Sequence, residues 1–371
     1  MIKCNVMKKE LIKSVLLFVS LFFAVFAKAQ TAEERVYIQK LELVPGGEMQ
    51  CMTIAIENAS HDNYTAFQFD VELPAGLEVA YYDGEPEIYV AENNHVYPPR
   101  HKPAVMYSVD GNLAKIRCYS PTNKVFEKRS GALIDIYVVP TSYMKPGDVE
   151  IKLHDVKFST VEETYGYKAD CIVSTDVKAS NECFLTLMVS SENQYATAIF
   201  PFDIETIPDE LEVYSCKSVK EEYLMLEEQK SIVAYKPYIL YAGNGFEARL
   251  SGVVDAGKYK KSVIDGYLTG TLVPQEITGG NGHYVMQKKD QSKAMFYKVG
   301  DTPFLIPAGK CWVTLPNGMQ GISMLRMSYT TAIDELEAEK GNNVIYDLSG
   351  RQVNTPTKGL YIINGKKMLV K

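Results

Sequence analysis

Residues 65–77 read Thr-Ala-Phe-Gln-Phe-Asp-Val-Glu-Leu-Pro-Ala-Gly-Leu, and this stretch decides the fold. Within it, apolar Phe67, Phe69, Val71 and Leu73 alternate with polar Gln68, Asp70 and Glu72. A period of two places the apolar side chains on one face of a β-strand and the polar side chains on the other. Pro74-Ala75-Gly76 then supplies a turn signal. The stretch therefore predicts a strand with one buried face and one solvent-facing face.

Short apolar runs of the same kind surround this strand. They cover residues 36–43, 49–57, 115–119, 132–139 and 149–158, and turn residues such as Pro45-Gly46-Gly47 and Pro146-Gly147 separate them. Many short strands separated by Gly and Pro predict an antiparallel β-sandwich. Within this sandwich, His61-Asp62 is predicted to lie in a polar loop and His154-Asp155 at the centre of a hairpin.

Three of these segments resemble parts of cohesin-like domains. Residues 65–77 resemble the second-hairpin region of that family, 130–136 (Ser-Gly-Ala-Leu-Ile-Asp-Ile) a later strand after a short Gly turn, and 149–159 the closing hairpin. The resemblance covers residues 35–160 and implies a jelly-roll sandwich, a fold that the family shares with certain cellulose-binding modules. It also implies protein docking or, through the related modules, polysaccharide binding.

A second β-rich region follows a predicted connection at residues 161–183. Strand-like runs between residues 184 and 320 predict a second antiparallel β-domain. The region resembles an uncharacterised module that stands between a cohesin-like domain and a sorting tail in exported bacterial proteins, which implies an architecture but no activity. A turn-then-strand phrase at 232–240 has an echo 74 residues later, at 306–316. Gly279-Gly280-Asn281-Gly282 is predicted to form a hairpin loop.

The N-terminus has the order of a secretory signal peptide. Lys8, Lys9 and Lys13 precede an apolar-dominated run at 15–27, and Ala27-Lys28-Ala29 provides a small-x-small cleavage site. Residues 1–29 are therefore predicted to be removed. The run is short for a membrane span, which needs about 20 apolar residues, so no transmembrane segment is expected after cleavage. An uncleaved anchor is the alternative.

The C-terminus, from Val344 to Lys371, contains three short β-like runs at 344–348, 360–363 and 368–370. Their pattern resembles the C-terminal (Por-type) sorting tail of proteins exported by the type IX secretion route. The resemblance implies the type IX machinery as a partner and a secreted or outer-cell-surface location. A linker at 321–343 is predicted before the tail, with a short acidic helix at 331–340. The alternative is a capping β-element without a role in export.

Charge and cysteine content set further bounds. Cleavage after residue 29 removes five lysines and one glutamate, which leaves 34 basic and 45 acidic side chains and a net charge of about −11. An acidic surface repels phosphate backbones, so nucleic acid is not an expected partner. Six cysteines remain, and they allow 15 pairings among which the sequence does not choose. Disulfides and buried free thiols both stay open. The six are Cys51, Cys118, Cys171, Cys183, Cys216 and Cys311.

No motif in the sequence identifies a reaction. The five histidines lack metal-ligand spacings such as HExxH, and no Gly-x-Ser-x-Gly elbow is present. Glycoside hydrolysis needs only two facing carboxylates, a geometry that one sequence does not reveal. We therefore expect a non-catalytic protein without metal or cofactor, and a glycoside hydrolase is the least favoured hypothesis.

One aromatic-rich segment is a candidate ligand-binding region. Its tyrosines offer flat apolar rings to a sugar or a partner protein while their hydroxyl groups stay hydrated. The alternative is that they are ordinary strand residues, because the chain has 25 tyrosines and Tyr favours strands. The candidates are Tyr81, Tyr82, Tyr89, Tyr97 and Tyr107, accompanied by His95, Arg100 and His101.

The sequence as a whole predicts an all-β protein: an N-terminal cohesin-like jelly-roll sandwich (30–160), a second antiparallel β-domain (184–320) and a small three-stranded C-terminal tail (344–371). The expected function is that of an exported interaction or adhesion protein with a protein partner. The alternative is a carbohydrate-binding accessory protein for polysaccharide use. A broad face of mixed polar and apolar residues favours the first hypothesis, and a planar row of tyrosines on one sheet face favours the second.

Overall fold

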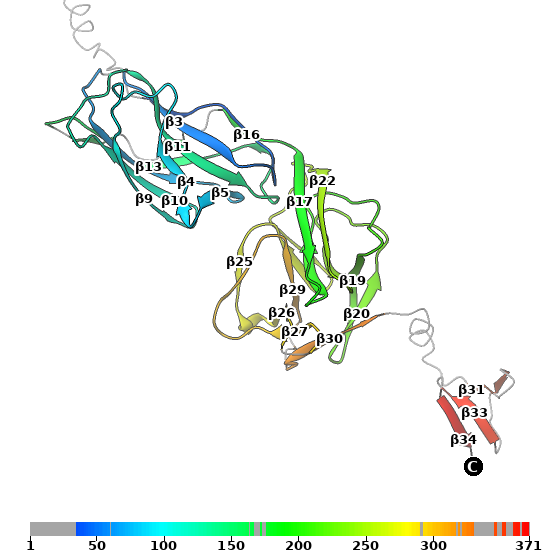
Figure 1. The fold of residues 1–371 in the computed structure, drawn as a ribbon. Coiled ribbons are helices and arrows are strands. Elements are labelled where there is room, and N and C mark those ends of the chain that lie inside the picture. The colour runs from blue at the N-terminus through cyan, green and yellow to red at the C-terminus, as the bar shows by residue number, and fades with distance from the viewer. Residues whose placement is uncertain are drawn as a thin grey trace, which may run out of the picture. The chain divides into compact units, whose positions relative to one another are not determined.

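The computed structural model describes residues 35–59, 61–162, 164–166, 171–172, 176–289, 292–316, 318–319, 321–329, 345–346, 351–353, 359–363 and 366–370. Within these residues the regular structure is β-strand except for one 3-10 turn, η1 (Gly279–Asn281), so the predicted all-β class is confirmed (Figure 1). The predicted signal peptide at 1–29 and the predicted helix at 331–340 lie outside the described residues. Among the helices of the described part, none has the length and apolar character that crossing a membrane requires.

The chain divides into two compact units. The first comprises Met1–Leu43, Glu48–Pro140 and Gly147–Ala179, and the second comprises Val44–Gly47, Thr141–Pro146 and Ser180–Lys371. Two short segments from the N-terminal half of the sequence therefore belong to the second unit. The boundary between the units follows packing rather than a single cut in the sequence.

The first sheet of unit 1 has the strand order β1-β3-β11-β5. These strands are β1 (Arg35–Ile38), β3 (Gln50–Glu57), β11 (Ser130–Pro140) and β5 (Leu77–Val79), all antiparallel to their neighbours. A further strand, β8 (Ile88–Val90), also pairs with β11. A β-bulge lies between Ala132 and Ile134 where β11 pairs with β3, and it leaves Leu133 outside the regular register.

The second sheet of unit 1 contains the stretch that opened the sequence analysis. Its order is β14-β13-β4-β10-β9, and the strands are β14 (Thr164–Gly166), β13 (Lys152–Ser159), β4 (Ala66–Glu72), β10 (Leu113–Tyr119) and β9 (Ala104–Asp110). β15 (Cys171–Ile172) also pairs with β13. The predicted alternation in β4 is present, because Phe67, Phe69 and Val71 are buried and the residues between them are partly exposed. This buried face contributes to the core of the sandwich.

Buried Tyr97 links the two sheets of unit 1. Its hydroxyl group donates a 2.6 Å hydrogen bond to the Leu133 carbonyl oxygen at the β11 bulge and lies 3.7 Å from Cys118 Sγ of β10. The Leu133 carbonyl oxygen also accepts a 3.3 Å hydrogen bond from the Ala91 amide, so Tyr97 supplies its second and shorter hydrogen bond. Tyr97 therefore contacts both sheets and donates a hydrogen bond to the carbonyl oxygen of the bulge residue.

Several predicted elements of unit 1 differ from those observed. Residues 36–43 form two strands, β1 and β2 (Leu41–Leu43), and β2 pairs in parallel with β16 (Val177–Ala179) in a small sheet that also contains β12 (Gly147–Asp148). The predicted hairpin centre at His154-Asp155 is wrong, because both residues lie inside β13. The strand has a β-bulge there, with Asp155 at φ 49°. Residue types that suit such a bulge also suit a turn, so the sequence indicated a turn. The region 161–183 contains β14, β15 and β16, and the next strand starts at Glu182.

Unit 2 is built around a ten-stranded sheet of order β18-β21-β19-β20-β30-β27-β26-β29-β24-β23. The strands are β18 (Tyr195–Ile199), β19 (Glu212–Lys220), β20 (Tyr223–Glu228), β21 (Pro237–Tyr241), β23 (Ser262–Asp265), β24 (Leu268–Thr271), β26 (His283–Gln287), β27 (Met295–Lys298), β29 (Lys310–Thr314) and β30 (Met324–Tyr329). β17 (Glu182–Val189) pairs with β22 (Phe246–Val253), and β25 (Gln275–Ile277) pairs with β28 (Phe304–Ile306).

The ten-stranded sheet curls so that β18 returns to β29. Thr197 Oγ1 donates to the Cys311 carbonyl oxygen and accepts a hydrogen bond from the Cys311 amide, both at 3.1 Å. The sequence echo has a counterpart in this region. The amide of Lys236 donates to Val233 O and that of Lys310 to Pro307 O, both at 3.3 Å, and Tyr235 and Gly309 have positive φ values of 61° and 78°. Each phrase thus makes the same turn before its strand.

Two further predictions for this half of the chain differ from the observed structure. The Gly279–Gly282 hairpin is wrong, because η1 connects β25 to β26 and these strands pair with other partners. The tail was expected to have three strands and has a four-stranded sheet of order β32-β31-β33-β34. Its strands are β31 (Ile345–Tyr346), β32 (Gln352–Val353), β33 (Gly359–Ile363) and β34 (Lys366–Val370). Most of the predicted linker at 321–343 lies outside the described residues.

Candidate functional site

Four of the five predicted binding tyrosines lie on three different sheets, and Tyr97 lies in a loop. Tyr81 and Tyr82 form β6 (Tyr81–Tyr82), which pairs with β7 (Glu85–Pro86) in a hairpin, and their exposed fractions are 55% and 76%. Asp83 and Gly84 close this hairpin with positive φ values of 50° and 85°, as a tight two-residue turn requires. The pair is fully presented to solvent on a short ribbon.

Tyr89 and Tyr107 belong to the two main sheets of unit 1. Tyr89 lies in β8, is 48% exposed and donates a 2.9 Å hydrogen bond to Glu87 Oε1. Tyr107 lies in β9 opposite Ile116, so its side chain shares the face of β10 that is buried. Tyr107 is accordingly less exposed than Tyr89, at 37%.

Tyr97 is a core residue and not a surface contact. Its side chain is 2% exposed, and its hydroxyl group donates a hydrogen bond to the Leu133 carbonyl oxygen. Burial raises the pKa of Tyr97 well above its usual value. A ring enclosed in this way has no face to offer a ligand, so Tyr97 leaves the set of candidates.

A hollow of about 450 Å3 lies on the solvent-facing side of the β3-β11-β8 sheet. Cross-strand pairing places Thr53 opposite Asp135 and Asp135 opposite Tyr89, so these side chains form one row. Cys51 and Tyr137 are also cross-strand partners and form the neighbouring row. The rest of the lining is Gln39, which follows β1, and Glu92, Asn93 and Asn94, which follow β8.

The hollow contains a fixed carboxylate and two tyrosine rings. Asp135 Oδ1 accepts a 2.6 Å hydrogen bond from Thr53 Oγ1, and Asp135 Oδ2 accepts a 3.4 Å hydrogen bond from the Glu92 amide. The rings of Tyr89 and Tyr137 meet edge to face, with centroids 6.2 Å apart and planes at 79°. The carboxylate and rings are therefore ordered before any ligand arrives.

The cysteine in the hollow is a poor nucleophile. Burial, followed by the charge of Asp135, raises the pKa of the Cys51 thiol. The thiolate is the reactive form, and the raised pKa keeps most of Cys51 in the thiol form near neutral pH. The charge on Cys51 in its ionised form, together with burial and Asp135, in turn raises the pKa of Tyr137. These shifts disfavour Cys51 as a nucleophile.

A second candidate surface lies on the solvent-facing side of β9, β10, β4 and β13. Met106, Arg117, Gln68 and Lys157 occupy one row across the four strands, and Ser108, Lys115, Asp70 and His154 occupy the next. We call these two rows, with Tyr119 of β10, the β9–β13 face. Met106 and Tyr119 are its exposed apolar members, at 58% and 43%. The face is broad and mixes charge, amide and apolar groups.

Polar contacts fix one end of the β9–β13 face. At the β13 bulge, Asp155 Oδ2 accepts a 2.6 Å hydrogen bond from Gln68 Nε2, and Asp155 Oδ1 lies 2.5 Å from Lys157 Nζ. His154 Nε2 lies 2.8 Å from Glu72 Oε2 on the neighbouring strand. The Lys157 hydrogen bond and burial act in opposite directions on Asp155, and the net effect lowers the pKa of Asp155. The bulge thus aims an ionised carboxylate into this face.

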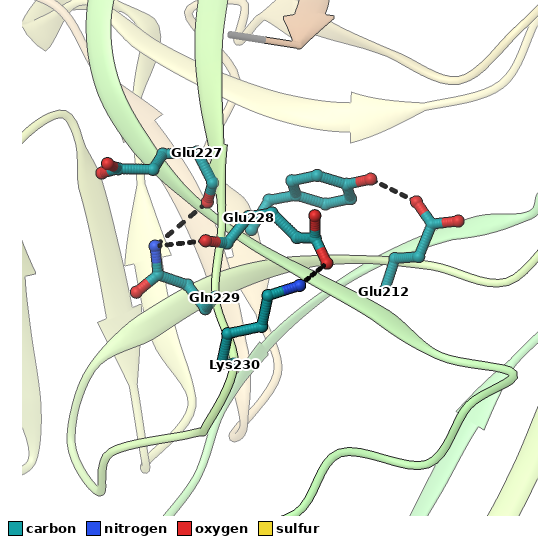
Figure 2. A network of polar contacts seen from close by, with 6 residues as sticks. Glu212, Glu227, Glu228, Gln229 and Lys230 are labelled. Carbon is teal, nitrogen blue, oxygen red and sulfur yellow. Dashed lines mark hydrogen bonds and ion pairs between the residues drawn. The ribbon is translucent and has the colours of Figure 1, made fainter. Parts of the chain in front are cut away.

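Unit 2 contains a tyrosine cluster that the sequence did not single out. Tyr195 and Tyr329 are joined by a hydrogen bond between their hydroxyl groups, and the Tyr214 hydroxyl group donates to Glu212. Figure 2 shows the hydrogen bond to Glu212 and the ion pair between the Glu228 carboxylate and Lys230, which are 2.6 Å apart. Burial and the bond to Glu212 raise the pKa of Tyr214. The rings of Tyr195 and Tyr241 are tilted by 45° to each other and those of Tyr214 and Tyr329 by 53°, so these rings offer no flat stacking surface.

The described cysteines are unpaired. Cys51 is exposed, whereas Cys118, Cys183, Cys216 and Cys311 are buried, and burial raises the pKa of each of these four thiols to about 12. The side chain of Cys171 lies outside the described residues. In the part of the chain that the structure describes, no group of three or more His, Cys, Asp or Glu side chains is placed to hold a metal ion.

No protein-family model matches this chain, and no curated protein sequence matches it. Among solved structures, it is similar to a non-cellulosomal cohesin from Archaeoglobus fulgidus, with 16% identity, a TM-score of 0.27, and coverage of 40% of this chain and 86% of the cohesin. It is also similar to a type I cohesin–dockerin complex from Clostridium thermocellum, with 14% identity, a TM-score of 0.31, and coverage of 39% and 98%.

A third similar structure is the cohesin module of a family 33 glycoside hydrolase from Clostridium perfringens. Its identity is 12%, its TM-score is 0.30, and the match covers 40% of this chain and 97% of that module. At these TM-scores the likeness carries no argument about family membership or activity. The function is therefore argued below from the surfaces of this chain.

Proposed function

We propose that this chain is an exported, non-catalytic interaction protein whose first unit docks a protein partner through the β9–β13 face. The observation that supports it is the row of Met106, Arg117 and Gln68 across three strands of one sheet. Protein interfaces are enriched in Met, Tyr and Arg, and their rims are polar. The β9–β13 face combines these residue types, with exposed Met106 and Tyr119 beside Arg117.

The test uses the full-length protein with a photo-crosslinking amino acid at position 106, expressed in the cells that make it. We expect a discrete crosslinked protein that excess unlabelled chain displaces and that Arg117→Glu abolishes. Glu78→Arg, on the solvent-facing side of β5 in the other sheet, is the matched control and keeps the crosslink. A crosslink that is insensitive to Arg117→Glu, or equally lost in both variants, contradicts the proposal.

Export is part of the proposal and is supported by the order of residues at the two ends of the chain. The signal peptide at 1–29 carries the protein across the inner membrane, and the tail from Val344 to Lys371 addresses it to the type IX machinery. Deleting the tail is expected to leave the protein inside the outer membrane. Unchanged amounts at the cell surface and in the medium after this deletion exclude the sorting role.

The second candidate function is carbohydrate binding in support of polysaccharide use. It is supported by the exposed rings of Tyr81, Tyr82 and Tyr89, although these lie on two different sheets and not in the single planar row expected for this function. Tyrosine rings suit the apolar faces of sugars while their hydroxyl groups stay hydrated. The test is a glycan array and a polysaccharide pull-down with the full-length secreted chain. Absence of retention on every glycan removes this function.

A further inference from the structure

The hollow on the β3-β11-β8 sheet is a more specific feature than the exposed tyrosines around it. It lies on the sheet opposite to the one that carries the β9–β13 face. Its volume of about 450 Å3 falls in the range of small-molecule sites, roughly 300–1,000 Å3. Two of its walls come from the central strands β3 and β11, so they are held in place on both sides.

The apolar contribution to the hollow comes from two tyrosines. Tyr89 and Tyr137 stand at 79° to each other and form two adjacent walls. An edge-to-face pair is itself a favoured arrangement, so both rings keep their orientation without a ligand. Aromatic walls beside solvent suit a ring that has an apolar face and a hydroxylated edge.

The polar lining both donates and accepts hydrogen bonds. Gln39, Asn93 and Asn94 carry amide groups with two donors and an acceptor each. The Asp135 carboxylate is oriented by Thr53 and by the Glu92 amide, and each of its oxygens keeps acceptor capacity. Sugar hydroxyl groups also donate and accept hydrogen bonds, so they match both the amide groups and the carboxylate of this lining.

The charge of the lining excludes acidic sugars. Asp135 and Glu92 are its charged members, and no Lys or Arg side chain belongs to it. A carboxylate, sulfate or phosphate on the ligand therefore meets repulsion without compensation. A neutral sugar avoids this penalty.

We propose that the hollow formed by Tyr89, Tyr137, Asp135 and the amides of Gln39, Asn93 and Asn94 binds a neutral saccharide unit. This inference rests on the carbohydrate-binding function proposed above and assigns it a site and a ligand class. It differs from a site built on Tyr81 and Tyr82, which lie on a separate hairpin. The ring walls hold the apolar face of the sugar, and Asp135 accepts a hydrogen bond from a hydroxyl group.

The first test measures binding of the full-length mature protein to a defined set of hexasaccharides by calorimetry. The neutral probes are cellohexaose, xylohexaose, mannohexaose and maltohexaose, and the charged probes are hexagalacturonate and hexaglucosamine. We expect a neutral probe to bind, and Tyr137→Ala and Asp135→Asn each to weaken it at least tenfold. Tyr82→Ala, an exposed tyrosine outside the hollow, is expected to change the Kd less than twofold.

The outcomes separate the site from the function. A neutral probe that binds normally to Tyr137→Ala but poorly to Tyr82→Ala leaves carbohydrate binding in place and overturns the hollow as its site. Binding of only a charged probe overturns the ligand class. Failure of every probe to bind the wild-type protein overturns both the site and the carbohydrate-binding function.

The second test needs no substitution and so does not depend on the folding of a variant. Cys51 lines the hollow and is exposed, so its alkylation by iodoacetamide reports access to the site. Peptide mass spectrometry at pH 8.5 gives the rate at Cys51 alone. We expect a saturating neutral probe to slow this rate at least threefold, whereas an unchanged rate in the presence of a probe that binds places the sugar elsewhere.

Discussion

Single side chains in this protein take roles that depend on their burial more than on their type. Tyr97 and Tyr82 both come from the aromatic-rich segment, yet their exposed fractions are 2% and 76%. The first joins two sheets, and the second lies on a hairpin in solvent. The same residue type therefore serves the core in one position and is free for contact in the other.

The Tyr97 hydroxyl group is expected to stabilise the sandwich. Tyr97→Phe leaves the Leu133 carbonyl with the longer 3.3 Å hydrogen bond from the Ala91 amide, and we expect a loss of about 0.5–1.5 kcal/mol of unfolding free energy. Tyr82→Phe is the matched control, with an expected change within about 0.5 kcal/mol. Urea unfolding of both variants measures the difference. Equal stabilities contradict a structural role for this hydrogen bond.

His283 is expected to make unit 2 sensitive to acid. Burial lowers the pKa of His283 below its usual 6.5, and its ring meets that of buried Trp312 at 86°. The unfolded chain then takes up the proton first, so stability is lost as the pH falls from about 6.5 towards the folded-state pKa and is unaffected above it.

The measurement compares wild type with His283→Gln in urea at pH 7.5 and pH 5.5. Trp312 is the single tryptophan of the chain and is 2% exposed, so its emission reports the unfolding of this unit. We expect the wild type to lose more stability between the two pH values than the variant does. Identical losses remove His283 as the cause.

At the scale of elements, strand position determines how well each strand is protected. β4 is paired on both sides, with β13 and β10, whereas β9 pairs with β10 at the end of the sheet order. Exposed Met106 lies on β9, so the proposed docking face includes the less protected end of the sheet. Binding there is expected to stabilise a strand that otherwise opens easily.

Hydrogen exchange tests this difference between strands. We expect the β4 amides to exchange only through global unfolding, and alternate β9 amides to exchange at least tenfold faster because they lack a partner strand. The Leu113–Tyr119 strand serves as an internal reference, since it is paired on both sides. Uniform protection across β4 and β9 contradicts the assignment of β9 as an open edge.

Strands with a local apolar period were predictable from sequence, and strands defined by distant partners were not. The alternating apolar residues Phe67, Phe69 and Val71 predict β4 from a stretch of seven residues. By contrast, β14 and β15 are held by backbone pairing with β13, and edge pairing of this kind leaves no apolar period. His154-Asp155 gave a turn signal because a β-bulge uses the same positive-φ residue types as a turn.

The candidate hollow was predicted only through Tyr89. Its other principal residues, Cys51, Asp135 and Tyr137, come from β3 and β11 and meet through strand register. Register depends on the bulge at Leu133 and on the fold of the whole sandwich. A pattern read along the chain does not contain this information, which is why Tyr97 was included and Tyr137 was missed.

At the scale of the whole molecule, unit 2 depends on two segments that precede most of it in sequence. The Phe184 amide donates a 2.8 Å hydrogen bond to Pro45 O, and the Tyr259 hydroxyl group donates a 2.7 Å hydrogen bond to Tyr143 O. Tyr143 also packs against two apolar clusters of unit 2. Gly46 has φ +69°, and a Cβ there would lie 1.7 Å from Phe184 O. The close contact between residues 45–46 and Phe184 therefore requires glycine at position 46.

A fragment that begins at Ser180 is therefore expected to be unstable. It lacks Val44–Gly47 and Thr141–Pro146, and removing an aromatic side chain such as that of Tyr143 alone costs about 3–5 kcal/mol. For a unit of this size, that loss lowers the Tm by roughly 10 °C or more. Calorimetry of fragments 180–329 and 35–329 makes the comparison. A Tm within 3 °C for the second unit in both contradicts this dependence.

The interleaving of the two units also orders events during synthesis. Residues 44–47 and 141–146 leave the ribosome long before β30 (Met324–Tyr329), the last strand of the ten-stranded sheet. The last residue of the first unit, Ala179, leaves the ribosome before the residues of the second unit that pack against these two segments. All residues of the first unit, and the two early segments of the second unit, are thus synthesised before residues 180–329, which contain the strands of the ten-stranded sheet.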